Sequence, residues 1–393
     1  MPSVADVLSY ADYLKVSPLA IDEDRCVAVR NRNATCRRCR DACLAAAITV
    51  QQNMVSVDPD ACVRCGVCTT VCPTFALSLL EPTSTQVLAS ALKTADRPRG
   101  MGVVACARAA ARHEADPERF AEVPCLGTVG ETELLGLAAA GLDDILLVDG
   151  DCATCKYGAA DGFITTSVHQ AADMLEAVGA QVIITRTSQF PSEVLSPRRA
   201  NVRGEDRRGL LAQTGRYMRS VAGNVARKTM EEKLGGAQAR PRTLKDRLSA
   251  GRSGRMPTFQ PEGNFQLLEC LEKTAEQPED LSTSEVALET RRFGSLAIDA
   301  DRCSGCGLCV LFCPTAALSY AEFDKPERED RKYLEFSAEL CTQCGLCRDV
   351  CLRKCLEVSS KVPLASLFDL EPELLEISRP EERASLFDRF RSS

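Results

Sequence analysis

Residues 62–73 read CVRCGVCTTVCP and carry four cysteines, at positions 62, 65, 68 and 72, with a proline directly after the fourth. Thiols repeated this closely along a chain are typical of a metal centre whose ligands are all thiolates. Gly66 permits a close approach of the backbone to the sulfurs, and Pro73 turns the chain away behind the last of them. The stretch therefore predicts a small module that folds around metal.

Cysteine is frequent throughout the chain. The 393 residues include 22 cysteines but only 2 histidines and no tryptophan. The N-terminal residues lack the pattern of a secretory signal, and no apolar run approaches the roughly 18 residues of a membrane span. We therefore expect a cytoplasmic protein, in which regularly spaced cysteines indicate metal rather than disulfides. Scarce histidine disfavours mixed Cys/His zinc sites and leaves Cys₄ zinc or iron–sulfur clusters.

Residues 62–73 resemble the motif C-x₂-C-x₂-C-x₃-C-P of bacterial-type two-cluster [4Fe–4S] ferredoxins. Related stretches are CRRCRDAC at 36–43, which has Cys26 upstream, CSGCGLCVLFCP at 303–314, and CTQCGLCRDVC at 341–351. In that motif the first three thiolates bind one cube, and the fourth binds the second cube of the same module. The resemblance therefore implies two ferredoxin-like modules, one near each end of the chain.

The same resemblance implies four sites for [4Fe–4S] clusters, numbered here 1 to 4. Site 1 comprises Cys26, Cys36, Cys39 and Cys72; site 2 comprises Cys43, Cys62, Cys65 and Cys68; site 3 comprises Cys303, Cys306, Cys309 and Cys351; site 4 comprises Cys313, Cys341, Cys344 and Cys347. Site 1 departs from the motif, because nine residues separate its first two cysteines and Leu44 stands where proline is usual. Structural zinc is the alternative at these sites. Cys355 is expected to be a buried small side chain.

Between the two modules, short apolar runs alternate with helical patterns. Strands are predicted for MGVVACA (101–107), FAEVPCL (120–126), DDILLVDG (143–150) and AQVIITR (180–186). Helices are predicted for GETELLGLAAAGL (130–142) and GFITTSVHQAADMLEAVGA (162–180). This alternation indicates a mostly parallel sheet. We therefore expect an α+β multidomain fold, with two ferredoxin-like iron–sulfur modules around a small α/β parallel-sheet domain.

Four more cysteines follow the ends of three of these predicted strands. They are Cys106, Cys125, Cys152 and Cys155, called the central site below. Open α/β sheets bind ligands at the carboxyl ends of their strands, so these four thiols are candidates for one metal centre. The stretches VVACA, PCLGTVGETELLGLAAAGLDDILLVDGDC and CKYG resemble the small iron–sulfur (delta) subunit of methyl-viologen-reducing hydrogenases. That resemblance implies a [2Fe–2S] cluster; another metal, or inert or redox-sensing thiols, are the alternatives.

These patterns divide the chain into five segments. They are an N-terminal 2[4Fe–4S] ferredoxin module (1–85), an α/β domain (98–192), a basic helical or flexible connector (193–290), a C-terminal 2[4Fe–4S] ferredoxin module (291–365) and a tail (366–393). Within the connector, residues 196–255 hold 16 Lys/Arg against 5 Asp/Glu, with one helix predicted from about Asp206 to Leu234. The segment is either a solvated linker or a dock for an acidic partner. Nucleic acid is a poorly supported partner, because the segment has a single tyrosine.

Arginines are concentrated around site 1. They are Arg25, Arg30, Arg32, Arg37, Arg38 and Arg40. Positive charge near a cluster favours its reduced form. We therefore predict higher reduction potentials at the N-terminal sites than at the C-terminal pair.

The sequence contains no G-x-G-x-x-G, Walker A or G-x-S-x-G motif, and no catalytic residue is predicted. We expect an electron-transfer subunit that relays single electrons rather than an enzyme with its own substrate site. The resemblances imply four [4Fe–4S] clusters and one [2Fe–2S] cluster. They imply, as partners, subunits of a hydrogenase, a formate dehydrogenase or a heterodisulfide-reductase-like complex. The alternative is an accessory protein that supplies electrons or sulfur during maturation of a metallo-oxidoreductase, with Cys152 and Cys155 as a working thiol pair. An iron–sulfur sensor ranks last.

Overall fold

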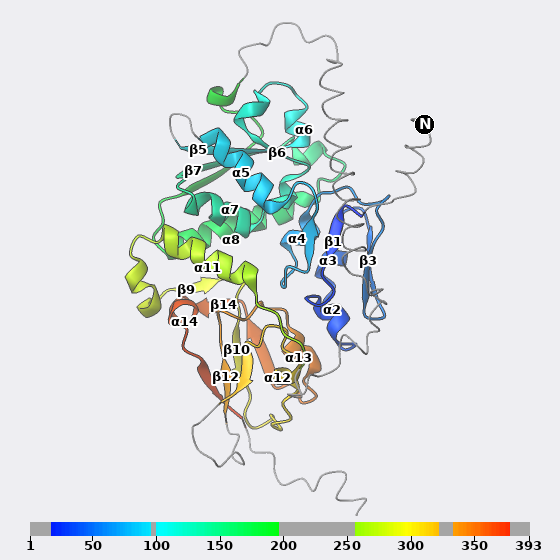
Figure 1. The fold of residues 1–393 in the computed structure, drawn as a ribbon, viewed down its shortest axis with the longest axis vertical. Helices are drawn as coiled ribbons and strands as arrows, with labels where there is room; N and C mark the ends of the chain where they lie inside the picture. Colours follow the sequence, from blue (N-terminus) through cyan, green and yellow to red (C-terminus); the bar gives the residue numbers. More distant parts are fainter. Residues whose placement is uncertain (1–16, 96–99, 196–255, 322–332, 378–393) are drawn as a thin grey trace, which may run out of the picture.

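The computed structural model of the protein describes residues 17–95, 100–195, 256–321 and 333–377. These residues form a mixed α/β structure with one four-stranded parallel sheet and five smaller antiparallel sheets. The parallel sheet and its helices lie at the top of Figure 1, the N-terminal segment lies at the right, and the C-terminal segment lies below. None of the helices in the described ranges is long and apolar enough to cross a membrane.

The N-terminal segment consists of two antiparallel strand pairs and three one-turn helices. Its elements are β1 (Leu19–Ile21), α2 (Val27–Arg30), α3 (Arg38–Asp41), β2 (Ile48–Gln51), β3 (Met54–Val57), α4 (Val67–Thr70) and β4 (Leu77–Leu79). Strand β1 pairs with β4, and β2 pairs with β3. Apolar side chains such as Leu19, Ile48 and Leu77 surround buried cysteines in one small cluster. Such a core is too small to stabilise a module of this size without a staple.

The α/β domain has the strand order β6-β5-β7-β8, with all three pairings parallel. Its elements are β5 (Met101–Cys106), α6 (Ala107–Ala110), η1 (Pro117–Arg119), β6 (Ala121–Val123), η2 (Leu126–Thr128), α7 (Glu131–Ala139), β7 (Asp144–Val148), η3 (Cys152–Thr154), α8 (Ala160–Ala177), β8 (Ile183–Thr187) and η4 (Ser192–Val194). The four predicted strands and both predicted helices are confirmed. The inner strands β5 and β7 are buried along nearly their whole length, as their continuous apolar runs predict.

Two helices that the sequence patterns did not single out complete this domain. Helix α5 (Ser84–Ala95) packs against β5 and β6. Helix α11 (Glu262–Thr274) packs along α7, with Leu267 and Leu271 fully buried. Since α11 lies in the segment expected to be a connector, that segment contributes a packed element there. The helix predicted at about 206–234, and the whole basic stretch 196–255, lie outside the described residues.

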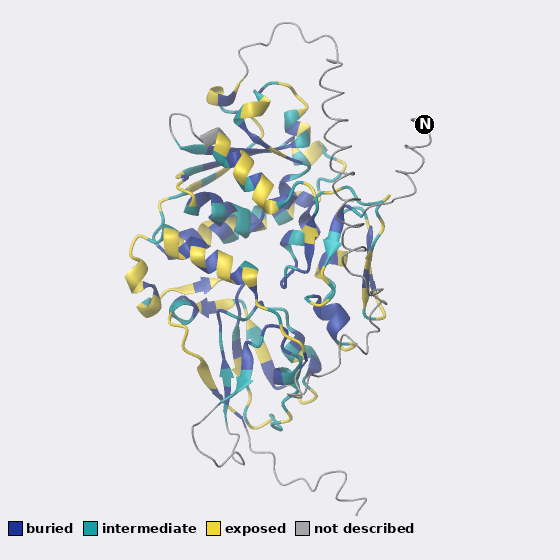
Figure 2. Ribbon diagram, in the orientation of Figure 1, coloured by how far each residue is buried: buried dark blue, intermediate teal, exposed yellow. Residues whose placement is uncertain are grey.

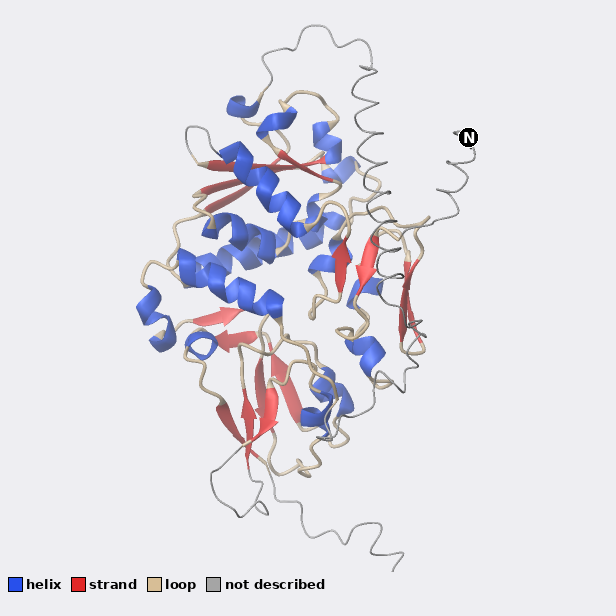
Figure 3. Cartoon of the chain, viewed as in Figure 1, coloured by secondary structure: helices blue, strands red, loops and turns tan. Residues whose placement is uncertain are grey.

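The C-terminal segment is built from three antiparallel sheets (Figure 3). Its elements are η5 (Pro278–Thr283), β9 (Ala287–Glu289), β10 (Ser295–Ile298), α12 (Leu308–Phe312), β11 (Leu318–Tyr320), β12 (Tyr333–Phe336), α13 (Leu346–Val350), β13 (Leu356–Ser359), β14 (Lys361–Pro363), α14 (Ala365–Phe368) and β15 (Glu373–Glu376). Strand β10 pairs with β13, β9 with β14, and β12 with both β11 and β15. Although β15 was expected in a tail, its buried Leu375 faces Leu334 across the sheet.

Buried residues continue from one segment into the next. The largest apolar cluster extends from the parallel sheet through α11 into the C-terminal strands, and Figure 2 shows buried ribbon along this path. A second, small cluster joins the N-terminal and C-terminal segments. It consists of Val27, Ala34, Leu346 and Val350. The N-terminal segment therefore packs against the C-terminal segment as well as against the domain that follows it in sequence.

Candidate metal centres

Three of the four cysteine motifs close the same backbone loop. The glycine four residues after the first cysteine has a left-handed φ and begins a short helix; these glycines are Gly66 (74°), Gly307 (71°) and Gly345 (76°). The third residue after the fourth cysteine is left-handed in all four motifs; these residues are Ala46 (50°), Phe75 (52°), Ala316 (59°) and Lys354 (50°). The motif at 36–43 has Arg40 in place of the glycine, which matches its irregular spacing.

The thiols assigned to site 1 lie together. Burial, followed by the neighbouring thiols of Cys72, Cys26 and Cys36, raises the pKa of Cys39 to about 12. Cys26 precedes helix α2, which occupies part of the long gap before Cys36. Cys72, the fourth cysteine of the second motif, therefore lies with thiols of the first motif, as the ferredoxin resemblance implies.

The thiols assigned to site 2 show the reciprocal exchange. Burial raises the pKa of Cys65, and the thiols of Cys43 and Cys62 contribute to the increase. Burial also raises the pKa of Cys68, followed by the thiols of Cys65, Cys62, Cys39 and Cys43. The two exchanged cysteines have matching hydrogen bonds, because the sulfur of each accepts from the backbone N–H four residues later: Ala47 N to Cys43 Sγ is 3.2 Å, and Ala76 N to Cys72 Sγ is 3.3 Å. Such N–H groups stabilise a thiolate.

The C-terminal segment repeats this exchange. Burial raises the pKa of Cys309 to about 12, and the thiols of Cys303, Cys306 and Cys351 contribute to the increase. At site 4, burial raises the pKa of Cys347 and the thiols of Cys344, Cys341 and Cys313 raise it further. In both cases the fourth cysteine of one motif lies with the first three of the other.

A fifth thiol accompanies site 3. Cys355 is buried, as expected, but its sulfur lies 3.4 Å from that of Cys351. The residue spacing alone, four positions along the chain, did not indicate whether the two side chains would meet. Cys355 is therefore placed where a cluster ligand would be, in addition to the four thiols that the motif supplies.

The four thiols of the central site line one cavity together with Arg108 and Tyr157. Burial raises the pKa of Cys125 to about 11; the N–H of Gly127 lowers it, and the thiols of Cys65, Cys106 and Cys155 raise it. Arg186 donates from Nη2 to Cys152 Sγ at 3.3 Å. The loops after β5, β6 and β7 thus bring these cysteines to the carboxyl edge of the sheet, as expected for an open α/β fold.

The residues at the five sites fit iron–sulfur clusters. Each site gathers four thiols, and thiolates with surrounding N–H donors are the ligands that such clusters use. Backbone N–H groups also point to Cys106 and Cys125, from Ala109 and Gly127, each at 3.4 Å. Within the described ranges, no group of three or more His, Cys, Asp or Glu side chains has a geometry that would hold a single metal ion.

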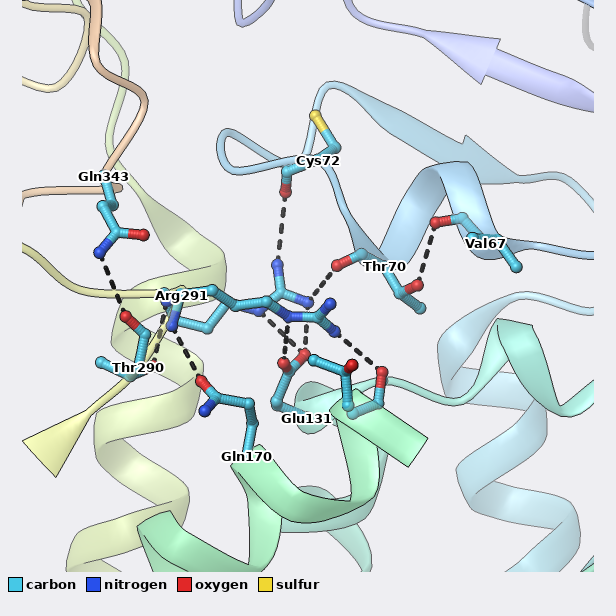
Figure 4. A network of polar contacts seen from close by, with 12 residues as sticks. Val67, Thr70, Cys72, Glu131, Gln170, Thr290, Arg291 and Gln343 are labelled. Carbon is cyan, nitrogen blue, oxygen red and sulfur yellow. Dashed lines mark hydrogen bonds and ion pairs between the residues drawn. The ribbon is translucent and has the colours of Figure 1, made fainter. Parts of the chain in front are cut away.

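A buried ion-pair network joins the three parts of the structure beside site 1 (Figure 4). Glu131, the first residue of α7, is fully buried and contacts Arg291 and Arg292 at 2.5 and 2.6 Å. Burial alone would raise the pKa of Glu131, but the two guanidinium groups hold it below its usual value. Arg292 also donates to the carbonyl oxygens of Thr70 (2.7 Å) and Cys72 (3.3 Å). No sequence motif marks these residues.

Two of the arginines expected around site 1 reach across to the C-terminal segment. Arg30 is buried and donates from Nε to the carbonyl of Phe312 at 3.1 Å, and Arg38 donates to the carbonyl of Gln343 at 3.1 Å. Each acceptor residue directly precedes a cysteine of site 4. The positive charge is therefore shared between sites 1 and 4, which reduces the expected contrast in potential between the two modules.

Two parts of the chain match known families. Residues 290–355 match the family model of a 4Fe-4S dicluster domain, and residues 55–78 match that of a 4Fe-4S binding domain. No curated protein matches the chain. The first match spans both C-terminal motifs, and the second spans the motif at 62–73. The chain therefore carries two ferredoxin-type 4Fe-4S domains, which supports iron–sulfur binding and a role in electron transfer.

Proposed function

We propose that the protein relays single electrons, with [4Fe–4S] clusters at sites 1 to 4 and a [2Fe–2S] cluster at the central site. The observation that carries the proposal is the exchange of fourth cysteines. In both segments, the fourth cysteine of each motif lies with the first three of the other. Two adjacent cubes in one module are the arrangement in which this exchange occurs.

The residues of the chain would hold, insulate and tune these centres. A bound iron–sulfur cluster supplies one-electron chemistry. Buried cysteines such as Cys39 and Cys68 keep sites 1 and 2 away from water, and the N–H groups of Ala47 and Ala76 stabilise thiolate charge. With the central site added, one chain would present five centres to its partners.

The proposed partners follow from the α/β domain. Its parallel sheet brings Cys106, Cys125, Cys152 and Cys155 to one cavity, which supports the resemblance to the delta subunit of methyl-viologen-reducing hydrogenases. On this basis, the relay connects a hydrogenase, a formate dehydrogenase or a heterodisulfide-reductase-like complex to another carrier. The segments 1–85, 98–192 and 291–365 are the proposed functional units, and the basic stretch 196–255 is a proposed dock for an acidic partner.

One observation bears on the accessory-protein alternative. Cys152 and Cys155 are only half buried, and Arg186 contacts the sulfur of Cys152, as would suit a working thiol pair. Burial nevertheless raises the pKa of Cys152 to about 11 despite that arginine, so the free thiol would carry little thiolate at neutral pH. This disfavours a reactive thiol pair.

Iron and sulfide analysis after anaerobic purification tests the proposal. The intact protein should contain about 18 irons, and Cys125→Ala should contain about 16, because a two-iron centre is lost. Cys270→Ala is the matched control, since Cys270 is buried in α11 outside all five sites and should leave the iron content unchanged. An intact protein with about 16 irons, unaffected by Cys125→Ala, would remove the central cluster and place the accessory role first.

A further inference from the structure

We infer that the five sites form one unbranched line in the order central site, site 2, site 1, site 4, site 3. This inference rests on the proposed function and adds the spatial order of its centres. Along the sequence, the α/β domain lies between the two modules. In space, the N-terminal module lies between the central site and the C-terminal module, so the central site becomes one end of the line.

The first step, from the central site to site 2, is a direct contact of two loops. Thr128 donates from Oγ1 to the carbonyl of Cys65 at 3.4 Å. A Cβ atom on Gly127 would lie 2.6 Å from Val67 Cγ2 and 2.9 Å from the same Cys65 carbonyl. Gly127 also donates to the sulfur of Cys125. The loop that carries Cys125 therefore packs tightly on the loop that carries Cys65.

The second step, from site 2 to site 1, lies within the N-terminal module. Cys39 is on α3 and Cys68 is on α4, and these two helices pack together. Both cysteines are buried in the same small apolar cluster. The two sites are therefore neighbours inside one core.

The third step crosses from the N-terminal module to the C-terminal module. Cys36 of site 1 and Cys344 of site 4 pack against the same four-residue apolar cluster. Hydrogen bonds hold this boundary, since Thr35 N contacts Asp349 Oδ2 at 2.7 Å and Arg38 contacts the carbonyl of Gln343. Site 1 is therefore the N-terminal site nearest the C-terminal module, and site 4 is the C-terminal site nearest the N-terminal module.

The fourth step, from site 4 to site 3, repeats the second. Cys309 lies on α12 and Cys347 on α13, and these helices pack together. Site 3 then forms the far end of the line. Its Cys306 is exposed, whereas all other cysteines are buried or half buried. The two ends at which electrons would enter or leave are therefore the central site and site 3.

Two matched variants, each with one cube per module, test the order by EPR of the reduced protein. Variant A carries Cys62→Ala, Cys65→Ala, Cys303→Ala and Cys306→Ala and keeps sites 1 and 4. Variant B carries Cys36→Ala, Cys39→Ala, Cys341→Ala and Cys344→Ala and keeps sites 2 and 3. The order predicts two cubes coupled to each other and an isolated central-site signal in A. In B it predicts a site 2 cube coupled to the central site and an isolated site 3 cube. Coupling between the two cubes in B, together with two uncoupled cubes in A, would overturn it.

Single-site variants provide a second reading if a module with one cube fails to fold. Removal of site 2 alone should slow the relaxation of the central-site signal, whereas removal of site 3 alone should leave it unchanged. The reverse result would overturn the order. Failure of the proposed function is distinguished by the iron content of the intact protein, because each missing cube lowers the expected content of about 18 irons by about 4. A full iron content with the wrong coupling pattern refutes the order alone.

Discussion

The guanidinium of Arg292 lies 2.6 Å from the carboxylate of Glu131, and both side chains are buried. The arginine precedes strand β10 of the C-terminal module, and the glutamate begins helix α7 of the α/β domain. The same arginine donates to the carbonyl of Thr70 in the N-terminal module. One ion pair therefore connects all three parts of the structure at the edge of site 1.

Replacement of the central carboxylate should destabilise the protein strongly. Glu131→Gln leaves Arg291 and Arg292 without their counter-charge, and breaking a buried pair in this way costs about 3–5 kcal/mol. Anaerobic denaturant unfolding should show the loss as a lower midpoint. Glu269→Gln is the matched control, because Glu269 pairs with Lys273 on the exposed face of α11 and should leave the midpoint unchanged. Equal midpoints for the two variants would contradict the role of the network.

The two neighbouring thiols at site 3, Cys351 and Cys355, predict that either can be replaced alone without loss of iron, but not both together. Cys355→Ala should keep the full iron content, because the motif cysteines remain. Cys351→Ala should also keep it, because the sulfur of Cys355 lies 3.4 Å from that of Cys351 and is available in its place. The double variant should lose about 4 irons. If Cys351→Ala alone loses as much iron as the double variant, Cys355 does not replace Cys351 as a ligand of site 3.

The hydrogen bond from Arg186 to Cys152 should raise the reduction potential of the central site. A positive charge and an N–H donor at a ligand sulfur both favour the reduced state. Arg186→Gln should therefore shift the central-site potential to a more negative value in an EPR-monitored titration, with unchanged iron content. Arg112→Gln serves as the control, because Arg112 contacts the carbonyls of Ser188 and Asp149 and no sulfur. An unshifted potential in Arg186→Gln would contradict the prediction.

The loop contact between the central site and site 2 leaves no room for a methyl group. Gly127→Ala places a Cβ 2.6 Å from Val67 Cγ2, so the two loops must separate, and such overpacking costs about 1–3 kcal/mol. The unfolding midpoint should fall, and the coupling of the central-site signal to site 2 should weaken. Gly162→Ala, in the first turn of α8 with open space around it, should leave the coupling unchanged and should not lower the midpoint. A Gly127→Ala protein with normal coupling would show that the loops tolerate the methyl group.

The sequence predicted the elements that have a clear period or spacing. Continuous apolar runs marked β5 and β7 because both are buried on two faces, and the glycine-ended helical patterns marked α7 and α8. Helix α11 was missed because its short buried face, which includes Leu267, Leu268 and Leu271, lies in a segment that was read as a connector. Its place within a Gly- and Arg-rich stretch made a linker the natural expectation.

Contacts between distant segments could not be read from local patterns. The exchange of Cys72 and Cys43 follows from the ferredoxin motif, but the Arg292–Glu131 pair joins residues that share no motif. Likewise, the arginines around site 1 were expected to make the reduction potentials of the N-terminal sites higher than those of the C-terminal pair. Arg30 instead crosses to Phe312 of the C-terminal module, because the modules pack through the cluster of Val27, Ala34, Leu346 and Val350. Spacing along the chain carries no information on such docking.

The position of the N-terminal module has a consequence for how the chain can be shortened. A truncation at one end of a sequence usually removes a peripheral part of the protein. Here the first segment touches the α/β domain through Cys65 and Thr128 and the C-terminal module through Thr35 and Asp349. A fragment that begins at Ser84 would keep helix α5, the central site and sites 3 and 4. It would lose sites 1 and 2, which lie between them in the proposed order. The N-terminal module comes first in the sequence but lies in the middle of the proposed line of sites.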